Sequence, residues 1–134
     1  MFDIGYKKDQ IVTHDELCKK AGCGCMGGVR YSSKNNVVIL FIKSNSQYDN
    51  LWEGDTLLYM GAGKGNQSVN SKSNIRIAEA KKNDTAICLF EWVDSVNCKY
   101  IGRMVLANQP YYEKRNNKYG EEEQKVIFPL KRSS

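Results

Sequence analysis

Val37-Val38-Ile39-Leu40-Phe41-Ile42 is the stretch that decides the fold. Its consecutive apolar residues, mostly β-branched, favour a strand that is buried on both faces and therefore lies inside a sheet. The stretch is also far shorter than the ~20 apolar residues of a membrane-spanning helix. The opening Met1-Phe2-Asp3-Ile4-Gly5 turns polar at once, unlike a secretory leader. The sequence therefore predicts a soluble, cytoplasmic protein that does not contact a membrane.

Shorter elements are expected on either side of this strand. A helix is expected from about Thr13 to Lys20, because Thr13 and Glu16 fit a capping box and Gly22 follows as a stop. Ser44–Gly54 is expected to be a polar loop, with Trp52 packed into the core. Further strands are expected at Asp55–Met60, Thr85–Trp92, Lys99–Ala107, Tyr111–Arg115 and Lys125–Leu130, and a second helix at Asn74–Lys82.

These elements predict a single α+β domain over residues 1–134, with an N-terminal helix at about 11–20 and a curved sheet or barrel at about 25–130. The chain carries 20 Lys and Arg against 15 Asp and Glu, a net charge of +5. This excess suits nucleic acid or another polyanion, although mild basicity also serves solubility alone.

Catalysis within this chain is not expected. His14 is the only histidine, and its place in a first helical turn predicts an exposed residue. Cys18, Cys23 and Cys25 lack the C-x2-C pair typical of zinc sites, so we expect packing roles, no metal and no other cofactor. Glu121–Lys125 contains an E-x-K string like that of metal-dependent nucleases, but such strings are common in Lys/Glu-rich chains. A small nuclease is therefore the weakest alternative.

Several short motifs resemble the core of SRA (SET- and RING-associated) domains, which bind modified cytosine in DNA. In that family a Tyr–acidic loop precedes a strand ending in Tyr-Thr-Gly-x-Gly, followed by Gly-Asp-Gln and by an Asn that opens an Ala-rich helix. The counterparts here are Tyr48-Asp49-Asn50, Tyr59-Met60-Gly61-Ala62-Gly63, Gly65-Asn66-Gln67 and Asn74. Gly27-Gly28-Val29-Arg30-Tyr31-Ser32 and Phe128-Pro129-Leu130 are similar to the bacterial branch found with HNH modification-dependent restriction endonucleases.

The resemblance implies an SRA-like, PUA-like curved β-barrel with two flanking helices, and a pocket for a flipped cytosine. Tyr48 and Tyr59 would stack on the two faces of the base. Asp49 or Asn50 would accept a hydrogen bond from its exocyclic amine; where the family has Asp, this chain offers Asn50 with Asp49 beside it. Met60 replaces the usual Thr at the pocket rim, and the backbone at Gly61 would read the remaining edge.

The resemblance also implies a DNA surface around the pocket, for which Arg30, Ser32, Lys64, Gln67 and Arg76 are the candidates. The expected partner is double-stranded DNA carrying a modified cytosine. The chain would be the specificity module of a modification-dependent restriction system, with any nuclease in another domain or subunit. A PUA-like module that binds RNA or a small ligand without base flipping is the alternative. The identity of the modification, 5-methylcytosine, 5-hydroxymethylcytosine or another, stays open.

Overall fold

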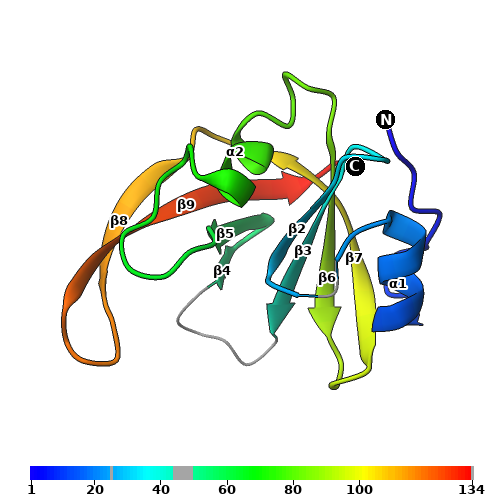
Figure 1. The fold of residues 1–134 in the computed structure, drawn as a ribbon, viewed down its shortest axis with the longest axis horizontal. Coiled ribbons are helices and arrows are strands. Elements are labelled where there is room, and N and C mark those ends of the chain that lie inside the picture. The colour runs from blue at the N-terminus through cyan, green and yellow to red at the C-terminus, as the bar shows by residue number, and fades with distance from the viewer. Residues whose placement is uncertain (25, 44–49, 134) are drawn as a thin grey trace.

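The computed structural model describes residues 1–24, 26–43 and 50–133, which form one curved, mixed sheet with two helices beside it (Figure 1). The expected α+β class is confirmed. In chain order the elements are β1 (Ile11–Thr13), α1 (His14–Ala21), β2 (Val29–Ser32), β3 (Val37–Lys43), β4 (Asn50–Glu53), β5 (Thr56–Met60), α2 (Lys72–Ala78), β6 (Ala86–Trp92), β7 (Asn97–Leu106), β8 (Tyr111–Asn116) and β9 (Glu122–Arg132). Neither helix is long enough to cross a membrane.

The strands follow the order β2-β3-β6-β7-β9-β5-β4, with β1 added beside β7 and β8 beside β9. β3 and β6 pair in parallel, whereas the other described pairs are antiparallel. Parallel neighbours require a crossover connection. The crossover between β3 and β6 carries β4, β5, a glycine-rich loop and α2, which together contain most of the candidate site.

The β3 strand is buried on both faces, as predicted. Val38, Leu40 and Ile42 belong to one core cluster, which also contains Leu57 and Phe128. The alternate residues Val37, Ile39 and Phe41 belong to a second cluster, which packs against α1 and the N-terminal segment. The alternation of strand side chains therefore divides one apolar run between two cores.

The α1 helix begins and ends close to the predicted positions. The Thr13 hydroxyl accepts a hydrogen bond from the Glu16 amide at 3.2 Å, and Gly22 ends the helix with a φ of 73°. A left-handed backbone of this kind favours glycine. α2 spans Lys72–Ala78 and is shorter than the expected Asn74–Lys82, because the chain leaves the helix at Glu79 and turns toward β6.

Two expectations for the region before β5 are wrong. Asn50–Glu53 forms the strand β4, whereas the sequence predicts a polar loop there. Trp52 is 42% exposed and does not lie in the core. Among the described residues β4 is the last strand of the sheet path and pairs with β5 alone, so Trp52 receives less cover than a residue of an inner strand.

Candidate nucleic-acid interface

Part of the predicted base pocket gathers at one end of the β4–β5 hairpin. Asn50 lies directly opposite Tyr59 in the antiparallel register, and Met60 and Gly61 follow at once. The backbone therefore brings these four positions together, whereas they are separated in sequence by a turn. The other two predicted pocket residues, Tyr48 and Asp49, lie outside the described residues.

Tyr59 connects two glycine-rich segments. Its side chain is 3% exposed, and its hydroxyl donates a hydrogen bond to the Gly28 carbonyl at 3.2 Å. The same carbonyl accepts a bond from the Phe41 amide at 3.1 Å. Burial raises the pKa of Tyr59 far above its ordinary value, so the phenol stays protonated and remains a donor. Tyr59 thus packs in the core, with its polar end against the Gly27–Gly28 turn.

Gln67, a candidate for the DNA surface, lies behind the glycine loop that follows β5. It is 5% exposed, and its amide nitrogen donates to the carbonyls of Gly61 at 2.8 Å and Gly63 at 3.0 Å. Its amide oxygen accepts from the Val126 backbone amide at 3.0 Å. The side chain therefore ties the loop to β9 and determines its shape.

Asn74 holds the same loop from α2 and is fully buried. Its side-chain oxygen accepts from the Ala62 amide at 2.7 Å, and its nitrogen donates to the Ala62 and Ser68 carbonyls, both at 3.0 Å. A Cβ atom at Gly61 would lie 2.7 Å from this side-chain oxygen and 2.5 Å from Val126. Only glycine fits there. The Asn at the start of an Ala-containing helix was the sequence signal for this clamp.

Arg30 points into the protein, where it supports the Gly27–Gly28 turn. Its side chain is 7% exposed, and Nε donates to the Gly27 carbonyl at 2.8 Å. The guanidinium lies over the Phe41 ring at 4.4 Å, while Nη1 donates to His14 Nε2 and to the Cys18 sulfur. These contacts use the charge inside the fold, behind the turn, so Arg30 does not present it on an open surface.

The remaining surface candidates differ in exposure. Ser32 is 2% exposed, and its hydroxyl accepts from the Asn35 amide at 3.3 Å. Lys64 and Arg76 are exposed, the first in the glycine loop and the second on α2. The Arg76 guanidinium lies 4.2 Å from the Tyr31 ring centroid, which holds the charge in place.

The expectation of an exposed His14 is wrong. Its ring centre lies 5.0 Å from that of Trp92 and 5.9 Å from that of Phe41, so aromatic side chains cover part of it. Burial, and then the charge of Arg30, lower the pKa of His14, and the neutral ring accepts the bond from Arg30. The sequence indicated where the helix begins. It did not indicate that β3 and β6 bring the rings of Phe41 and Trp92 against His14. No metal-binding group of three or more His, Cys, Asp or Glu side chains occurs among the described residues.

The β8–β9 hairpin adds a basic wall that the sequence did not predict. Met60 shares a cavity of about 520 Å³ with residues from this hairpin, among them Arg115, Lys118 and Lys125. The Lys125 ammonium donates to the Gly65 carbonyl at 2.7 Å and pairs with Glu123 at 3.2 Å. The E-x-K string therefore braces the glycine loop against the hairpin.

Comparison with solved structures shows that the chain has an SRA-like fold. The structure of the sulfur-binding and SRA domains of ScoMcrA with phosphorothioated DNA matches at a TM-score of 0.72 and 14% identity, over 95% of this chain and 40% of that one. The SUVH5 SRA complex with hemimethylated CG DNA matches at 0.67 and 16%, over 96% and 89%. The modification-dependent restriction endonuclease AspBHI matches at 0.64 and 15%, over 87% and 36%. No protein-family model and no curated protein matches the sequence.

Replacing the buried clamp residue Asn74 by Ala should lower the free energy of unfolding by about 3 kcal/mol, because loop amide and carbonyl groups lose their partners. Chemical denaturation measures this change. Asn70→Ala is the matched control, since Asn70 is exposed in the same segment and should change the value by less than ~0.5 kcal/mol. Equal effects of the two substitutions would contradict the clamp.

The lowered pKa of His14 predicts a pH dependence of stability. The unfolded chain takes up a proton near pH ~6.5, whereas the folded chain resists it until a lower pH. The stabilising contribution is therefore complete above that value and is lost as the pH falls through the folded pKa. His14→Gln keeps an acceptor for Arg30 but does not titrate, so its unfolding midpoint should depend less on pH between about 5 and 7.5. Parallel profiles for the two proteins would refute this assignment.

Proposed function

We propose that this chain recognises a modified cytosine in duplex DNA by flipping the base into a pocket at the end of the β4–β5 hairpin. The observation that carries the proposal is the junction at Tyr59, which brings Asn50, the Gly27–Gly28 turn and the loop from Gly61 together on an SRA-like fold. Solved structures with this fold include complexes with hemimethylated and fully hydroxymethylated CG DNA.

The proposed pocket combines stacking with hydrogen bonding. Tyr48 supplies one aromatic face, and Tyr59 forms the inner wall. Asp49 or Asn50 accepts a hydrogen bond from the exocyclic amine; an Asn carbonyl does so without the charge assistance of a carboxylate. Backbone groups near Gly61 read the rest of the base, and Met60 contributes an apolar rim.

Preorganisation supports this use of the glycine loop. Gln67 and Asn74 fix the backbone from Gly61 to Gly63 before any ligand binds. Arg30 fixes the carbonyl of Gly27 on the opposite segment. A loop that is already ordered loses less conformational entropy on binding, so more of the contact energy remains for discrimination. We assign Gln67, Ser32 and Arg30 to positioning, rather than to direct DNA contact.

Attraction to the DNA backbone comes from exposed cations around this loop. Lys64 and Arg76 are exposed, and Lys118 stands on the β8–β9 hairpin. Such charges give affinity without sequence information and make it dependent on salt.

The biological setting that fits best is a modification-dependent restriction system in the cytoplasm. ScoMcrA and AspBHI are restriction endonucleases, and this chain spans 27% of a ScoMcrA restriction endonuclease structure and 36% of the AspBHI structure. We propose that the chain is the specificity module, without catalytic activity of its own, and that cleavage belongs to another domain or subunit.

A competition titration at near-physiological salt tests the function. Matched duplexes carry plain, 5-methyl or 5-hydroxymethyl cytosine, and an RNA duplex of the same sequence serves as a fourth competitor. We expect at least a ten-fold preference, ~1.4 kcal/mol, for one modified duplex. Equal and steeply salt-dependent binding to the three DNA duplexes would overturn recognition of these two marks. Preference for RNA would favour the PUA-like alternative.

Tyr48→Ala should abolish the preference for the modified duplex while salt-sensitive binding remains, because one stacking face is lost at ~1–3 kcal/mol. Tyr48→Phe keeps the ring and should keep the preference. Selectivity that survives in a folded Tyr48→Ala protein would place the pocket elsewhere.

Lys64→Gln and Arg76→Gln should weaken binding to modified and plain duplexes alike, and each should reduce the salt slope by about 1. Lys19→Gln is the charge-matched control, because Lys19 is exposed on α1, at the other end of the view from the β8–β9 hairpin (Figure 1). If Lys19→Gln weakens binding as much, net charge rather than a defined surface drives binding.

A further inference from the structure

The β8–β9 hairpin extends away from the rest of the sheet as a two-stranded ribbon (Figure 1). Its strands pair in register from Tyr111 with Ile127 to Asn116 with Glu122. Every residue of β8 except Arg115 is exposed. An exposed strand contributes few apolar contacts to a core, so core packing does not explain the length of this ribbon.

The ribbon is fixed to the glycine loop of the proposed DNA interface. The Gln67 amide donates to the Gln124 carbonyl at 2.7 Å, and the Gln124 amide donates to the Asn66 side-chain oxygen at 2.8 Å. The Lys125 ammonium donates to the Gly65 carbonyl at 2.7 Å. The ribbon therefore has a defined position relative to the proposed base pocket and is continuous with that interface.

The turn at the end of the ribbon borders the same space as the end of β5. The cavity of about 520 Å³ is lined by Met60 and also by Asn117 and Lys118 of the turn. Met60 lies opposite Ile127 in the sheet, and strand alternation places Lys125 on the same face as Ile127. DNA that reaches the proposed pocket would thus pass close to the ribbon.

The turn is ordered by the Asn117 side chain. Its oxygen accepts hydrogen bonds from the Tyr119 amide at 2.9 Å and the Glu121 amide at 3.0 Å, and its nitrogen donates to Glu123 at 3.1 Å. Hydrogen bonds from Asn117 and then from Lys125 lower the pKa of Glu123, so this acceptor stays ionised at neutral pH. A turn ordered in advance loses less entropy when it binds.

This ordered turn holds an aromatic ring in water. Tyr119 is 73% exposed, more than any other Phe, Tyr or Trp in the described part of the chain. The Lys118 ammonium lies 5.1 Å from the centre of its ring. An aromatic ring beside a cation matches a partner that combines flat apolar surfaces with negative charge, and stacked nucleotides have both.

The charges along the ribbon are largely balanced. Three of its four carboxylates pair with cations of the ribbon itself, and Lys118 stands outside these pairs. A balanced ribbon can lie against DNA without net repulsion, so its contribution to affinity has to come from specific contacts. The pairs are Lys114 with Glu122 at 3.4 Å, Arg115 with Glu113 at 2.7 Å and Lys125 with Glu123 at 3.2 Å.

We propose that the β8–β9 ribbon contacts the duplex beside the modified cytosine, and that Tyr119 inserts between base pairs there as an aromatic wedge. The inference rests on the proposed function, because it requires DNA in the neighbouring pocket. A wedge partly unstacks one base step and kinks the duplex. The kink weakens the stacking of the nearby target base and eases its rotation into the pocket. Lys118 accompanies the ring and contacts a phosphate.

Titration of the full chain with a duplex that carries the preferred modified cytosine tests the wedge. Tyr119→Ala should weaken binding about ten-fold, because a stacked aromatic ring is lost. Tyr119→Phe keeps the ring and should bind within about two-fold of wild type. Val96→Ala is the matched control, since Val96 is 57% exposed in the turn between β6 and β7, and it should leave the affinity unchanged. Because Tyr119 and Val96 are exposed, the variants should keep the fold, which circular dichroism checks.

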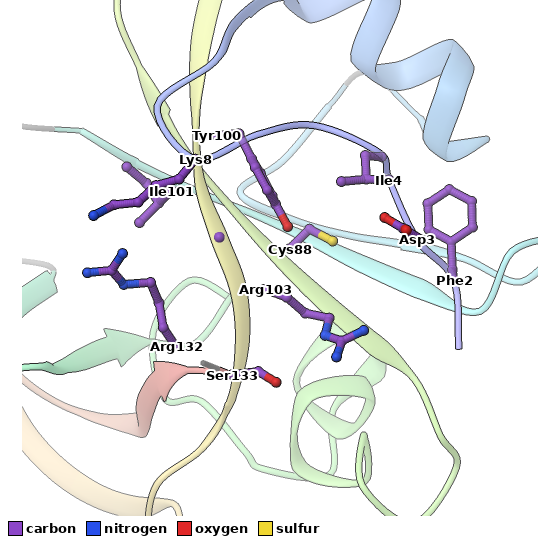
Figure 2. A pocket seen from close by; sticks show the side chains of 11 residues that line it. Phe2, Asp3, Ile4, Lys8, Cys88, Tyr100, Ile101, Arg103, Arg132 and Ser133 are labelled. Carbon is purple, nitrogen blue, oxygen red and sulfur yellow. The ribbon is translucent and has the colours of Figure 1, made fainter.

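A charge substitution tests the accompanying cation. Lys118→Gln should weaken binding about three-fold and reduce the salt slope by about 1. Arg103→Gln is the charge-matched control, because Arg103 is exposed on β7 and lines a separate hollow beside the N-terminal segment (Figure 2). That hollow shares no lining residue with the cavity between Met60 and the ribbon. Arg103→Gln should therefore leave both the affinity and the salt slope unchanged.

Energy transfer between dyes at the two ends of the duplex measures the kink. At saturating concentrations, wild type and Tyr119→Phe should shorten the distance between the dyes. Tyr119→Ala should leave this distance longer than wild type does.

The opposite results overturn the proposal at identifiable steps. Unchanged affinity in Tyr119→Ala, or an equal loss in Val96→Ala, removes the contact. An equal loss in Tyr119→Phe assigns the effect to the hydroxyl and removes the wedge, and an unchanged distance between the dyes in Tyr119→Ala removes the insertion. If the wild-type protein prefers no modified duplex, the proposed function fails and the wedge fails with it. Failure of the wedge alone appears only in the Tyr119 variants, while the preference of the wild-type protein remains.

Discussion

Parallel pairing of β3 with β6 is the constraint on which the rest of the molecule depends. Because β3 is apolar on both faces, it needs cover above and below. Its buried backbone groups also need hydrogen-bond partners, which β2 and β6 supply on its two sides. Parallel pairing then forces the intervening chain to leave the sheet and return. Every candidate residue of the base pocket belongs to this excursion, the part of the chain that connects β3 to β6. Within it, β5 lies in the sheet beside β9. The core and the site are thus consequences of the same pairing.

The excursion is held in place by polar side chains that point inward. Asn74 and Gln67 bond to the backbone of the glycine loop after β5, and Tyr59 joins β5 to the Gly28 carbonyl. Arg30 in turn supports the Gly27–Gly28 turn, which precedes β3. Glycine makes a segment easy to bend but also costly to order. Buried side chains that bond to the backbone remove that freedom during folding. The loops can then be glycine-rich, as close approach to a ligand requires, and still be ordered.

Local sequence patterns correctly predicted those features that depend on neighbouring residues in the chain. The two-sided burial of Val37–Ile42 and the limits of α1 follow from side-chain type and from the Thr13 and Gly22 signals. The resemblance to SRA domains correctly predicted the fold. The exposure of Trp52 was not predictable, because it depends on β4 being the last strand of the path. The burial of Arg30 depends on Phe41 and His14, which the fold alone brings to it.

The distribution of cations explains why a net charge of +5 says little about where a polyanion binds. The Arg30 side chain lies inside the fold, where it contacts a backbone carbonyl, an imidazole and an aromatic face. Lys125 braces a loop and is paired with Glu123. Lys64 is exposed in the glycine loop and Arg76 on α2, whereas Arg103 and Arg132 are exposed on β7 and β9. Attraction falls off over a Debye length of ~8 Å at physiological salt, so each group acts on its own surroundings. One modest net charge is therefore compatible with cations in quite different structural roles, and the place of each cation in the fold, rather than the total charge, decides what it can contact.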